Sequence, residues 1–338
     1  MTTLDQALAA SHRLLLEAPL RPLQGHRFQP TGFPDLGAGA YQLPDGTPML
    51  LVESAQSVAN RLETAIWDEA NDRPIAPLGS MPFVRVRLDG SATTNSILEA
   101  HRLNSPYILE GSDTRVFEML SKGLDTSANA PVDLQKLASI LLRVDPNSLL
   151  HGVFLAKKEL AGGRLRIKRA LSGFIEARGV RVAESGGVKN DRVDPSGDTA
   201  KGFGNVPYHR TEYVAADIRA YFNLDLALLR SYRLDSPALE FLIALALFKI
   251  RRFVSEGLRL RTACDLELQG DVVVTRPDGF HMPVDQDLSD QLARLVEKCT
   301  EKRLFASPPV TELTWKPDKV ARRKKPAEED GDDAEDEE

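Results

Sequence analysis

The sequence predicts a globular protein in which helices and strands are mixed along the chain. Apolar residues make up 42% of the 338 residues, a proportion typical of chains that bury a core. One stretch, 237–267, contains a helical and a strand pattern in succession. From Leu239 to Val254 it is apolar nearly all round, as in a helix buried on most sides, and from Leu258 to Leu268 apolar and polar residues alternate, as in a half-buried strand. We expect the rest of the chain to be organised around this stretch.

Strands and one clear helix are expected in the first 90 residues. Ala55, Ala59, Leu62 and Ile66 recur at helical spacing and form one apolar stripe. The segment 21–46 holds four prolines and five glycines, so it is expected to be mostly loop. The expected elements are strands over 13–18, 49–52 and 82–88 and a helix over 53–70.

Short helices and basic strands are expected further along. Thr93, Thr94 and Asn95 are candidate caps for a helix over 96–103, the first part of a helical insertion at about 91–145. A basic hairpin and a polar, glycine-rich mobile loop are expected over about 151–206, with the loop at 185–206. The remaining expected elements are helices over 113–120, 132–142, 217–232 and 288–304, and strands over 151–157, 206–216 and 271–275, the last pairing with the 258–268 strand.

The net charge of −6 is determined by the C-terminal residues. Residues 328–338 hold nine acids, and without them the net charge is +3. The basic run at 321–326 directly precedes these acids. Blocks of like charge are typical of solvated, disordered segments, so we expect a folded body over 1–316 and a disordered, basic-then-acidic tail over 317–338.

Cysteine usage and hydropathy indicate a cytoplasmic protein without a membrane partner. The two cysteines, Cys264 and Cys299, form no framework, which fits a reducing compartment. The N-terminus lacks the pattern of a signal peptide. The longest apolar run, Phe241 to Phe248, is too short to cross a bilayer.

The sequence contains none of the usual catalytic motifs. It lacks a phosphate-binding glycine loop, a zinc-protease motif and a nucleophile elbow. No two of its six histidines stand at metal-ligand spacing, so neither a metal nor a cofactor is predicted and binding is favoured over catalysis. A histidine, serine and aspartate that meet only in space remain an open alternative. Four histidines directly precede an arginine, and both side chains stack on unpaired bases or pair with phosphates: His12, His26, His101 and His209.

Two surfaces are candidates for binding an anion. Five cations lie within thirteen residues at the end of the 239–254 helix and in the strand that follows, namely Lys249, Arg251, Arg252, Arg259 and Arg261. The polar face of the 53–70 helix carries hydroxyls and amides, which suit hydrogen bonds to sugars, phosphates and base edges. Its members are Glu53, Gln56, Ser57, Asn60 and Arg61. The alternative for both surfaces is an ordinary solvated face.

Four long segments resemble one known family. They are LLVESAQSVANRLE (51–64), TNSILEAHRLNSPYI (94–108), PYHRTEYVAADIRAYFNLDLALLRSY (207–232) and LIALALFKIRRFVSEGLRLRTACDLE (242–267). These segments resemble the backbone subunit of the type I-G (formerly I-U) CRISPR surveillance complex, Cascade, a member of the RAMP superfamily. The resemblance extends over roughly residues 10–316. Where the family more often has VQSQAN this chain has AQSVAN, which departs from the family at Val58.

The resemblance implies an α+β fold of RAMP type, with a modified ferredoxin-like (RRM-like) antiparallel sheet and inserted helical and β-hairpin elements. It implies a protein that is not an enzyme, whose copies assemble side by side along CRISPR RNA and prop its bases out for pairing with target DNA. The implied partners are CRISPR RNA, target DNA, other copies, other subunits of the complex and a separate helicase-nuclease. The basic hairpin and loop correspond to a thumb-like element that folds over a neighbouring copy. The expected guide contacts are Ser54, Gln56, Ser57, Asn60, Arg61, His209, Arg210, Lys249, Arg251, Arg252, Arg259 and Arg261.

Two rival functions remain at this point. One is a stand-alone RAMP-like endoribonuclease that uses His209 or His101 as its general base. The other is a scaffold that binds no nucleic acid and recruits basic partners through its acidic tail.

Overall fold

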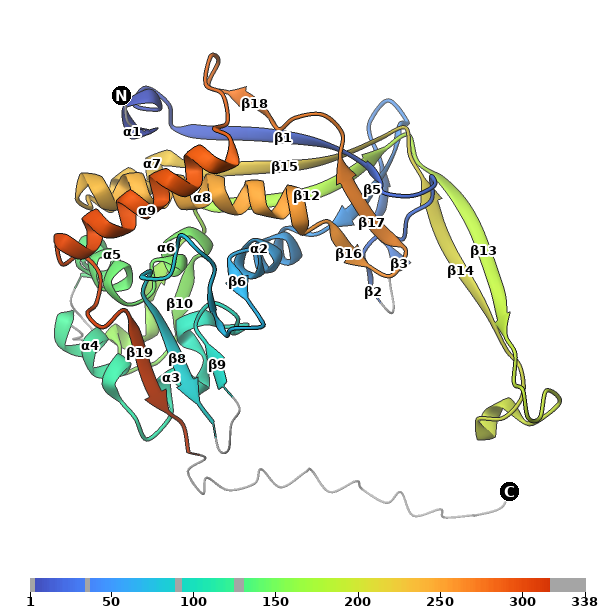
Figure 1. Ribbon diagram of the computed structural model, residues 1–338, viewed down its shortest axis with the longest axis horizontal. Coiled ribbons are helices and arrows are strands. Elements are labelled where there is room, and N and C mark those ends of the chain that lie inside the picture. Colours follow the sequence, from blue (N-terminus) through green and yellow to red (C-terminus); the bar gives the residue numbers. More distant parts are fainter. Residues whose placement is uncertain (1–3, 34–36, 89–92, 125–130, 317–338) are drawn as a thin grey trace, which may run out of the picture.

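The computed structural model describes residues 4–33, 37–88, 93–124 and 131–316 (Figure 1). The expected tail at 317–338 therefore lies outside the described residues. No helix in the described ranges is long and apolar enough to cross a membrane.

An eight-stranded antiparallel sheet forms the centre of the protein. The long strands β1 and β15 lie in its middle, with β12 beside β15 and β17 beside β1. The eighth strand, β18, also pairs with β1. The strands in order across the sheet are β16 (Arg259–Arg261), β17 (Cys264–Leu268), β1 (Arg13–Pro22), β15 (Asp217–Asp225), β12 (Leu171–Arg178), β5 (Pro48–Glu53) and β4 (Ala40–Gln42), with β18 at Val273–Arg276.

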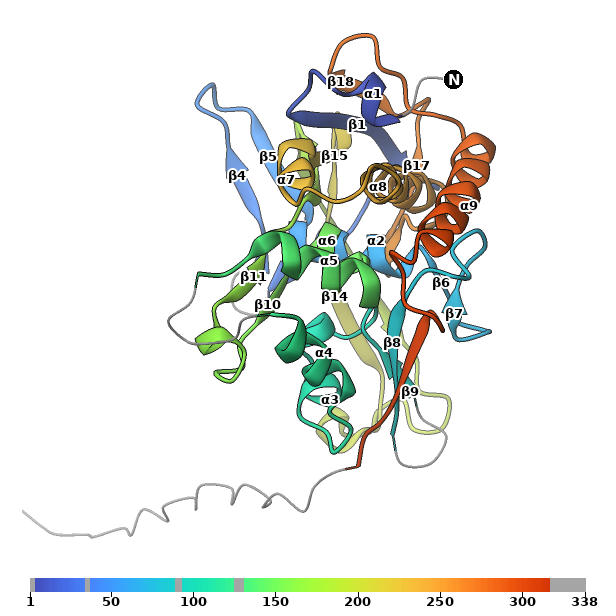
Figure 2. The same ribbon diagram turned by 90° about the vertical axis from the view of Figure 1, so that its left-hand side faces the viewer.

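Two helices cover one face of this sheet (Figures 1 and 2). They are α2 (Ala55–Thr64) and the 21-residue α8 (Ser236–Glu256), and α9 (Asp285–Glu301) packs beside α8. Thirteen residues of α8 are buried, which confirms the predicted helix within the core. Along β1 and β15 every second side chain is buried, so the helix-facing side of the sheet is apolar and the other side is half-exposed.

A smaller lower part contains short helices, two-stranded units and a three-stranded sheet in the order β19–β8–β9, in which β19 runs parallel to β8. Helices α4 (Arg115–Gly123) and α5 (Leu134–Val144) confirm two predicted helices. The predicted helix at 96–103 is wrong, because Asn95 ends a strand and its side chain accepts hydrogen bonds from the N–H groups of Ile97 and Leu98 in a turn. The other elements are α1 (Leu4–Ala7), β2 (Gly32–Phe33), β3 (Gly37–Ala38), β6 (Trp67–Asp68), β7 (Arg73–Pro74), β8 (Phe83–Arg87), β9 (Thr93–Asn95), α3 (Pro106–Leu109), α6 (Asn147–His151), β10 (Val153–Leu155), β11 (Leu165–Ile167), α7 (Leu226–Ser231), β19 (Val310–Thr314) and the 3-10 helices η1 (Arg102–Asn104), η2 (Ala161–Gly163) and η3 (Thr199–Lys201).

A long hairpin stands away from the body (Figure 1). Its strands are β13 (Arg181–Lys189) and β14 (Val206–Val214), paired without interruption from Arg181↔Val214 to Lys189↔Val206. We call this hairpin the arm and its connecting segment 190–205 the tip. The predicted mobile loop is therefore wrong over 185–189, which pair with β14 as a strand.

Three other segments differ from the predictions. Residues 217–225 form β15 where a helix was expected, and the expected 258–268 strand is folded back on itself as the β16–β17 hairpin. The turn between β16 and β17 contains Ala263 with a φ of 59°, a conformation that alanine adopts rarely. The expected hairpin partner of β17 pairs with β1 instead, and α2 ends at Thr64, earlier than predicted.

Candidate nucleic-acid interface

The polar face of α2 begins with a helix cap. The Ser54 side chain accepts a hydrogen bond from the Ser57 N–H at 3.3 Å, which satisfies one of the open donors of the first turn. The Ser57 hydroxyl in turn donates to the carboxylate of Glu53. Two of the predicted guide contacts, Ser54 and Ser57, therefore hold the helix start in place.

A buried carboxylate joins α2 to β16. The Glu53 side chain is 1% exposed and accepts a hydrogen bond from Arg61 Nε at 3.0 Å, and its second oxygen pairs with Arg261. Arg261 also donates from Nη1 to the carbonyls of Gln29 at 3.0 Å and Val52 at 3.2 Å. Burial lowers the pKa of both guanidiniums, but an arginine stays charged at neutral pH. One negative charge is therefore shared by two positive charges.

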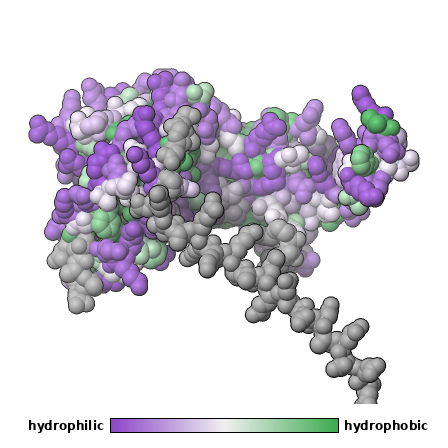
Figure 3. Space-filling view, turned by 90° about the horizontal axis from the view of Figure 1, so that it is seen from below, coloured by the Kyte–Doolittle hydropathy of each residue, from purple (hydrophilic) through white to green (hydrophobic). Residues whose placement is uncertain are grey.

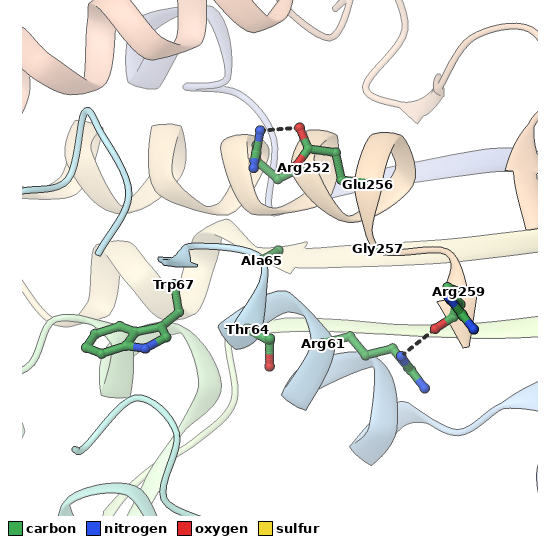
Figure 4. Close-up of a pocket in the computed structure, with 8 residues that line it drawn as sticks. All are labelled: Arg61, Thr64, Ala65, Trp67, Arg252, Glu256, Gly257 and Arg259. Atoms are coloured by element: carbon green, nitrogen blue, oxygen red, sulfur yellow. Dashed lines mark hydrogen bonds and ion pairs between the residues drawn. The ribbon is translucent and has the colours of Figure 1, made fainter. Parts of the chain in front are cut away.

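Three arginines from three elements line a pocket of about 310 Å³ (Figure 4). Arg61 lies on α2, Arg252 on α8 and Arg259 on β16, and Arg61 Nη1 donates to the Arg259 carbonyl at 3.4 Å. Arg252 is paired with Glu256 one turn further along α8. Arg259 is exposed and forms no ion pair with any described residue. We call these three residues the arginine pocket.

The amides of α2 lie at the surface of the same helix as Arg61. Gln56 and Asn60 are both exposed, and the Gln56 amide donates to Asn60 Oδ1 at 2.9 Å. Arg169 reaches the same helix, because its Nη2 donates to Gln56 Oε1 at 2.7 Å. Seen from below, the face of the body is largely hydrophilic (Figure 3). An exposed row of amides flanked by guanidiniums is suited to a sugar-phosphate backbone.

The middle of the arm contributes a second cationic surface. His209 and Arg210 on β14 line a groove of about 790 Å³ together with Arg261. The His209 side chain is 66% exposed and lies 3.9 Å from Glu184, and Arg210 lies 3.9 Å from Glu212. Arg261 therefore connects this groove to the buried carboxylate of Glu53, with which it forms an ion pair.

Two of the predicted contacts are placed elsewhere. Lys249 is fully buried, so the prediction that it belongs to the surface cluster is wrong. It donates to Asn147 Oδ1 and lies 2.8 Å from His151 Nε2, because α8 is enclosed by protein at this point. Arg251 is turned away from the arginine pocket and donates to the carbonyls of Pro283 and Met282 at 3.1 and 3.2 Å.

The sequence reasoning missed the role of Glu53 and the position of Arg169. Glu53 was grouped with the polar face of the helix, whereas it ends β5 and is buried. Its one usable signal is its place directly after an apolar strand, where a carboxylate needs a partner. Arg169 lies 113 residues from Gln56, and no sequence pattern links the two.

Lys249 belongs to a buried polar network between α8, α6 and α2. Burial lowers its pKa to about 7, although the carboxylates of Glu63 and Asp145 act in the opposite direction. Burial raises the pKa of Asp145 to about 6 and, together with the charge of Lys249, lowers the pKa of His151 well below its ordinary value.

We expect Lys249 to make stability depend on pH. Between about pH 7 and about pH 10 the unfolded chain binds a proton at Lys249 that the folded chain lacks, so the free energy of unfolding rises with pH by about 1 kcal/mol per unit. In Lys249→Met this contribution is absent. Urea denaturation of both proteins at about pH 7.5 and about pH 9 measures the difference. Equal pH dependence of the two proteins would contradict the assignment.

No group of three or more histidine, cysteine, aspartate or glutamate side chains within the described ranges is placed to hold a metal ion.

Comparison with known proteins identifies the family. The sequence profile of CRISPR-associated protein GSU0053 matches residues 14–182, which is half of the chain. The protein belongs to this CRISPR-associated family. The matched region runs from β1 into β13 and includes all of α2, the helix on which the candidate interface is built.

Two solved structures share a distant likeness with this CRISPR-associated protein. A chain from a CRISPR RNA-guided surveillance complex in a pre-nicking state has 15% sequence identity and a TM-score of 0.40, covering 85% of this chain and 89% of the other. Csc2 from Thermofilum pendens has 12% identity and a TM-score of 0.32, covering 86% and 76%. At these TM-scores we draw no conclusion from either likeness. No curated protein matches the sequence.

Proposed function

We propose that the protein is the CRISPR RNA-binding backbone subunit of a type I-G surveillance complex, with several copies assembled along one guide RNA. The observation that carries this proposal is the excess of guanidinium around Glu53, directly beside the exposed amides of α2. Arg61 and Arg261 bring two positive charges to one buried carboxylate, and the exposed Arg259 adds a third beside Arg61, so the surface attracts a polyanion. Because the protein belongs to a CRISPR-associated family, we propose that this polyanion is RNA.

The chain order of the central strands supports a modified ferredoxin-like, RRM-like sheet of RAMP type. Helix α2 stands between β1 and β12 in sequence, and α8 stands between β15 and β17. In space the four strands lie in the order β17–β1–β15–β12. This is a β-α-β-β-α-β unit whose fourth strand lies beside the first and whose third lies between the first and second. Under this proposal the helical segment at about 91–145 and the arm are insertions into that unit.

The remaining partners follow from the same proposal. Copies of the chain hold the guide so that its bases pair with target DNA, and other subunits complete the complex. A separate helicase-nuclease cuts the bound target, so this subunit has no catalytic task. His101 and His209, the candidate general bases of a ribonuclease, then act as binding residues.

We assign the arm to contact with a neighbouring copy. Its tip carries exposed apolar side chains, among them Val193 at 94% and Phe203 at 55% exposure. Figure 3 shows green, hydrophobic surface at the far end of the arm. Apolar side chains gathered on an exposed surface mark a site of contact with another molecule. A neighbouring copy on the same RNA would cover them.

Replacing the tip 190–205 by Asn-Gly tests this assignment. The two residues close a hairpin between the last paired residues, Lys189 and Val206. We expect the melting temperature of the isolated chain to change by less than about 2 °C, because the tip lies far from the core, and cooperative assembly on a long RNA to be lost. Binding to an RNA that holds a single copy serves as the control and stays unchanged. If the shortened chain still assembles cooperatively on a long RNA, the arm does not form the contact between neighbouring copies.

Binding of labelled single-stranded RNA by the purified protein tests the proposed function itself. We expect a dissociation constant that rises steeply with salt, because each phosphate contact releases counterions. The labelled RNA stays intact during the incubation. Cleavage that disappears in His101→Ala or His209→Ala would favour the ribonuclease instead, and absence of binding at low salt would favour a scaffold.

A further inference from the structure

A second polar pocket lies apart from the arginine pocket and shares no lining residue with it. It has a volume of about 480 Å³ and lies between η1, the β10–β11 hairpin and Arg169. Arg169 joins it to the start of α2, where its Nη1 donates to the Ala55 carbonyl at 3.2 Å and its Nη2 to Gln56 at 2.7 Å. We call it the hairpin pocket. A volume of this size is in the range of small-ligand sites.

The hairpin pocket has a net positive charge. Arg166, Lys168 and Arg169 line it, and none of the three forms an ion pair with a carboxylate in the part of the chain that the structure describes. Arg102 also lines the pocket, but Glu63 neutralises it through two hydrogen bonds of 2.6 and 2.7 Å. Three uncompensated cations therefore face one space, an arrangement that attracts an anion.

The buried wall of this pocket contains an unsatisfied ring nitrogen. His151 is 2% exposed, and its Nε2 lies 2.8 Å from Lys249 Nζ. Its Nδ1 has no hydrogen-bond partner among the described residues. An unpartnered buried nitrogen costs free energy, and it is retained where a ligand or water completes the bond. The pocket is thus cationic at its surface and polar at its floor.

An exposed aromatic ring completes the site. Phe154 lines the pocket with 52% of its surface exposed, and it is paired across β10 and β11 with Arg166. Asn104 accepts the Ala156 N–H at 2.9 Å through Oδ1, so its amide nitrogen is the group left to donate into the pocket. Cations beside an aromatic face are the combination that single-stranded nucleic acid requires, because phosphates need charge and unpaired bases need a stacking surface.

We propose that the hairpin pocket binds one nucleotide of a single-stranded RNA, with its base against Phe154 and its phosphate against Arg166, Lys168 and Arg169. The inference rests on the proposed function and adds a second contact to it. The strand that lies along the amides of α2 continues past the first turn of that helix into this pocket. An acidic peptide would use the cations and leave the Phe154 ring without a role.

Charge reversal within the pocket is the first arm of the test. The full chain with Arg166→Glu and Lys168→Glu is titrated with fluorescein-labelled oligouridine at several salt concentrations. We expect the dissociation constant to rise by at least about tenfold and the slope of log K against log salt to fall by about one to two. Lys158→Glu, which reverses one charge in place of two, is the control, because this lysine is exposed near the same hairpin and does not line the pocket. Its dissociation constant stays within about twofold of the original chain.

Removal of the ring is the second arm. Phe154→Ala is expected to raise the dissociation constant for oligouridine about tenfold with the salt slope unchanged, because stacking involves no counterion. With an abasic strand of the same length the substitution has no effect. An equal loss on both strands would show that the ring supports the fold of the hairpin, and this would overturn its assignment to a base.

The outcomes separate this inference from the function on which it rests. If the original chain binds oligouridine and the pocket variants bind equally well, the hairpin pocket is not an RNA site and the proposed function stands. If the original chain binds no RNA, both fail. Should the double glutamate variant lose its melting transition, Arg166→Gln with Lys168→Gln replaces it, with the same expectation for the salt slope. Loss of self-assembly with unchanged RNA affinity would assign the pocket to a protein partner.

Discussion

Replacing Arg259 by glutamate is expected to raise the dissociation constant for single-stranded RNA by at least about tenfold. Arg259 is the exposed member of the arginine pocket, and no carboxylate among the described residues pairs with it. Its charge is therefore available to a phosphate, whereas Arg61 and Arg252 are each shared with a glutamate. A glutamate at this position faces the RNA with the wrong sign and adds repulsion to the lost contact. Anisotropy titrations over a range of salt concentrations measure both the affinity and the number of phosphate contacts.

Arg294→Glu is the control for this experiment. Arg294 is exposed on α9 and does not line the arginine pocket, so the same change of net charge occurs at a distance from it. We expect its affinity to stay within about twofold of the original chain. If Arg259→Glu binds RNA as tightly as Arg294→Glu while both keep their melting temperature, the arginine pocket is not part of the interface.

Replacing Glu63 by alanine is expected to lower the free energy of unfolding by about 3–5 kcal/mol. The Glu63 side chain is nearly fully buried and accepts two hydrogen bonds from Arg102, at 2.6 and 2.7 Å, and one from Asn147 at 2.7 Å. Without it the Arg102 guanidinium is a buried charge with no carboxylate partner, and Lys249 loses the carboxylate that raises its pKa most. Urea denaturation at neutral pH gives the difference.

A double substitution separates the buried charge from simple loss of packing. Glu63→Ala with Arg102→Met removes both charged partners, so it is expected to recover part of the loss seen in Glu63→Ala alone. Glu69→Ala, at an exposed position of the same region, is expected to change the free energy by less than about 0.5 kcal/mol. A loss in Glu63→Ala no larger than that of Glu69→Ala would show that the network does not stabilise the fold.

The spacing of apolar residues was sufficient to predict those helices and strands in which it fits only one kind of element. Helix α8 is apolar nearly all round, has Pro237 in its first turn and ends directly before Gly257, so its position and burial follow from the sequence. Strand β5 and the start of α2 follow from an apolar run that changes to helical spacing. Helix α9 was found by its amphipathic spacing.

The central strand β15 was predicted as a helix because its residues fit two periods. Ile218, Tyr221 and Phe222 have the spacing of one helix face, yet Ile218, Ala220, Phe222 and Leu224 are the residues that alternate into the core. The strand pairs with β1 and β12 on both sides, and these partners are distant in sequence. Pairing with distant strands outweighs the helical spacing of the apolar residues, and a single sequence does not show which strands pair.

The sequence predicted which types of residue form the candidate site, but it did not predict how they are arranged in space. The hydroxyls and amides of α2 and the cations at the end of α8 were identified by residue type. Which cations reach the surface depends on partners far along the chain: Lys249 is held by Asn147, 102 residues away, and Arg61 by the carbonyl of Leu260, 199 residues away. The separation of Lys249 and Arg251 from the arginine pocket therefore required the fold.

The central claim is that copies of this chain coat a guide RNA. The most direct measurement is to express the chain together with a CRISPR array and its neighbouring genes, purify it, and record the ratio of absorbance at 260 and 280 nm with a gel of the bound RNA. The proposed function predicts a large assembly that carries RNA of one discrete length. A monomer free of RNA, even at the low salt where phosphate contacts are strongest, would contradict it.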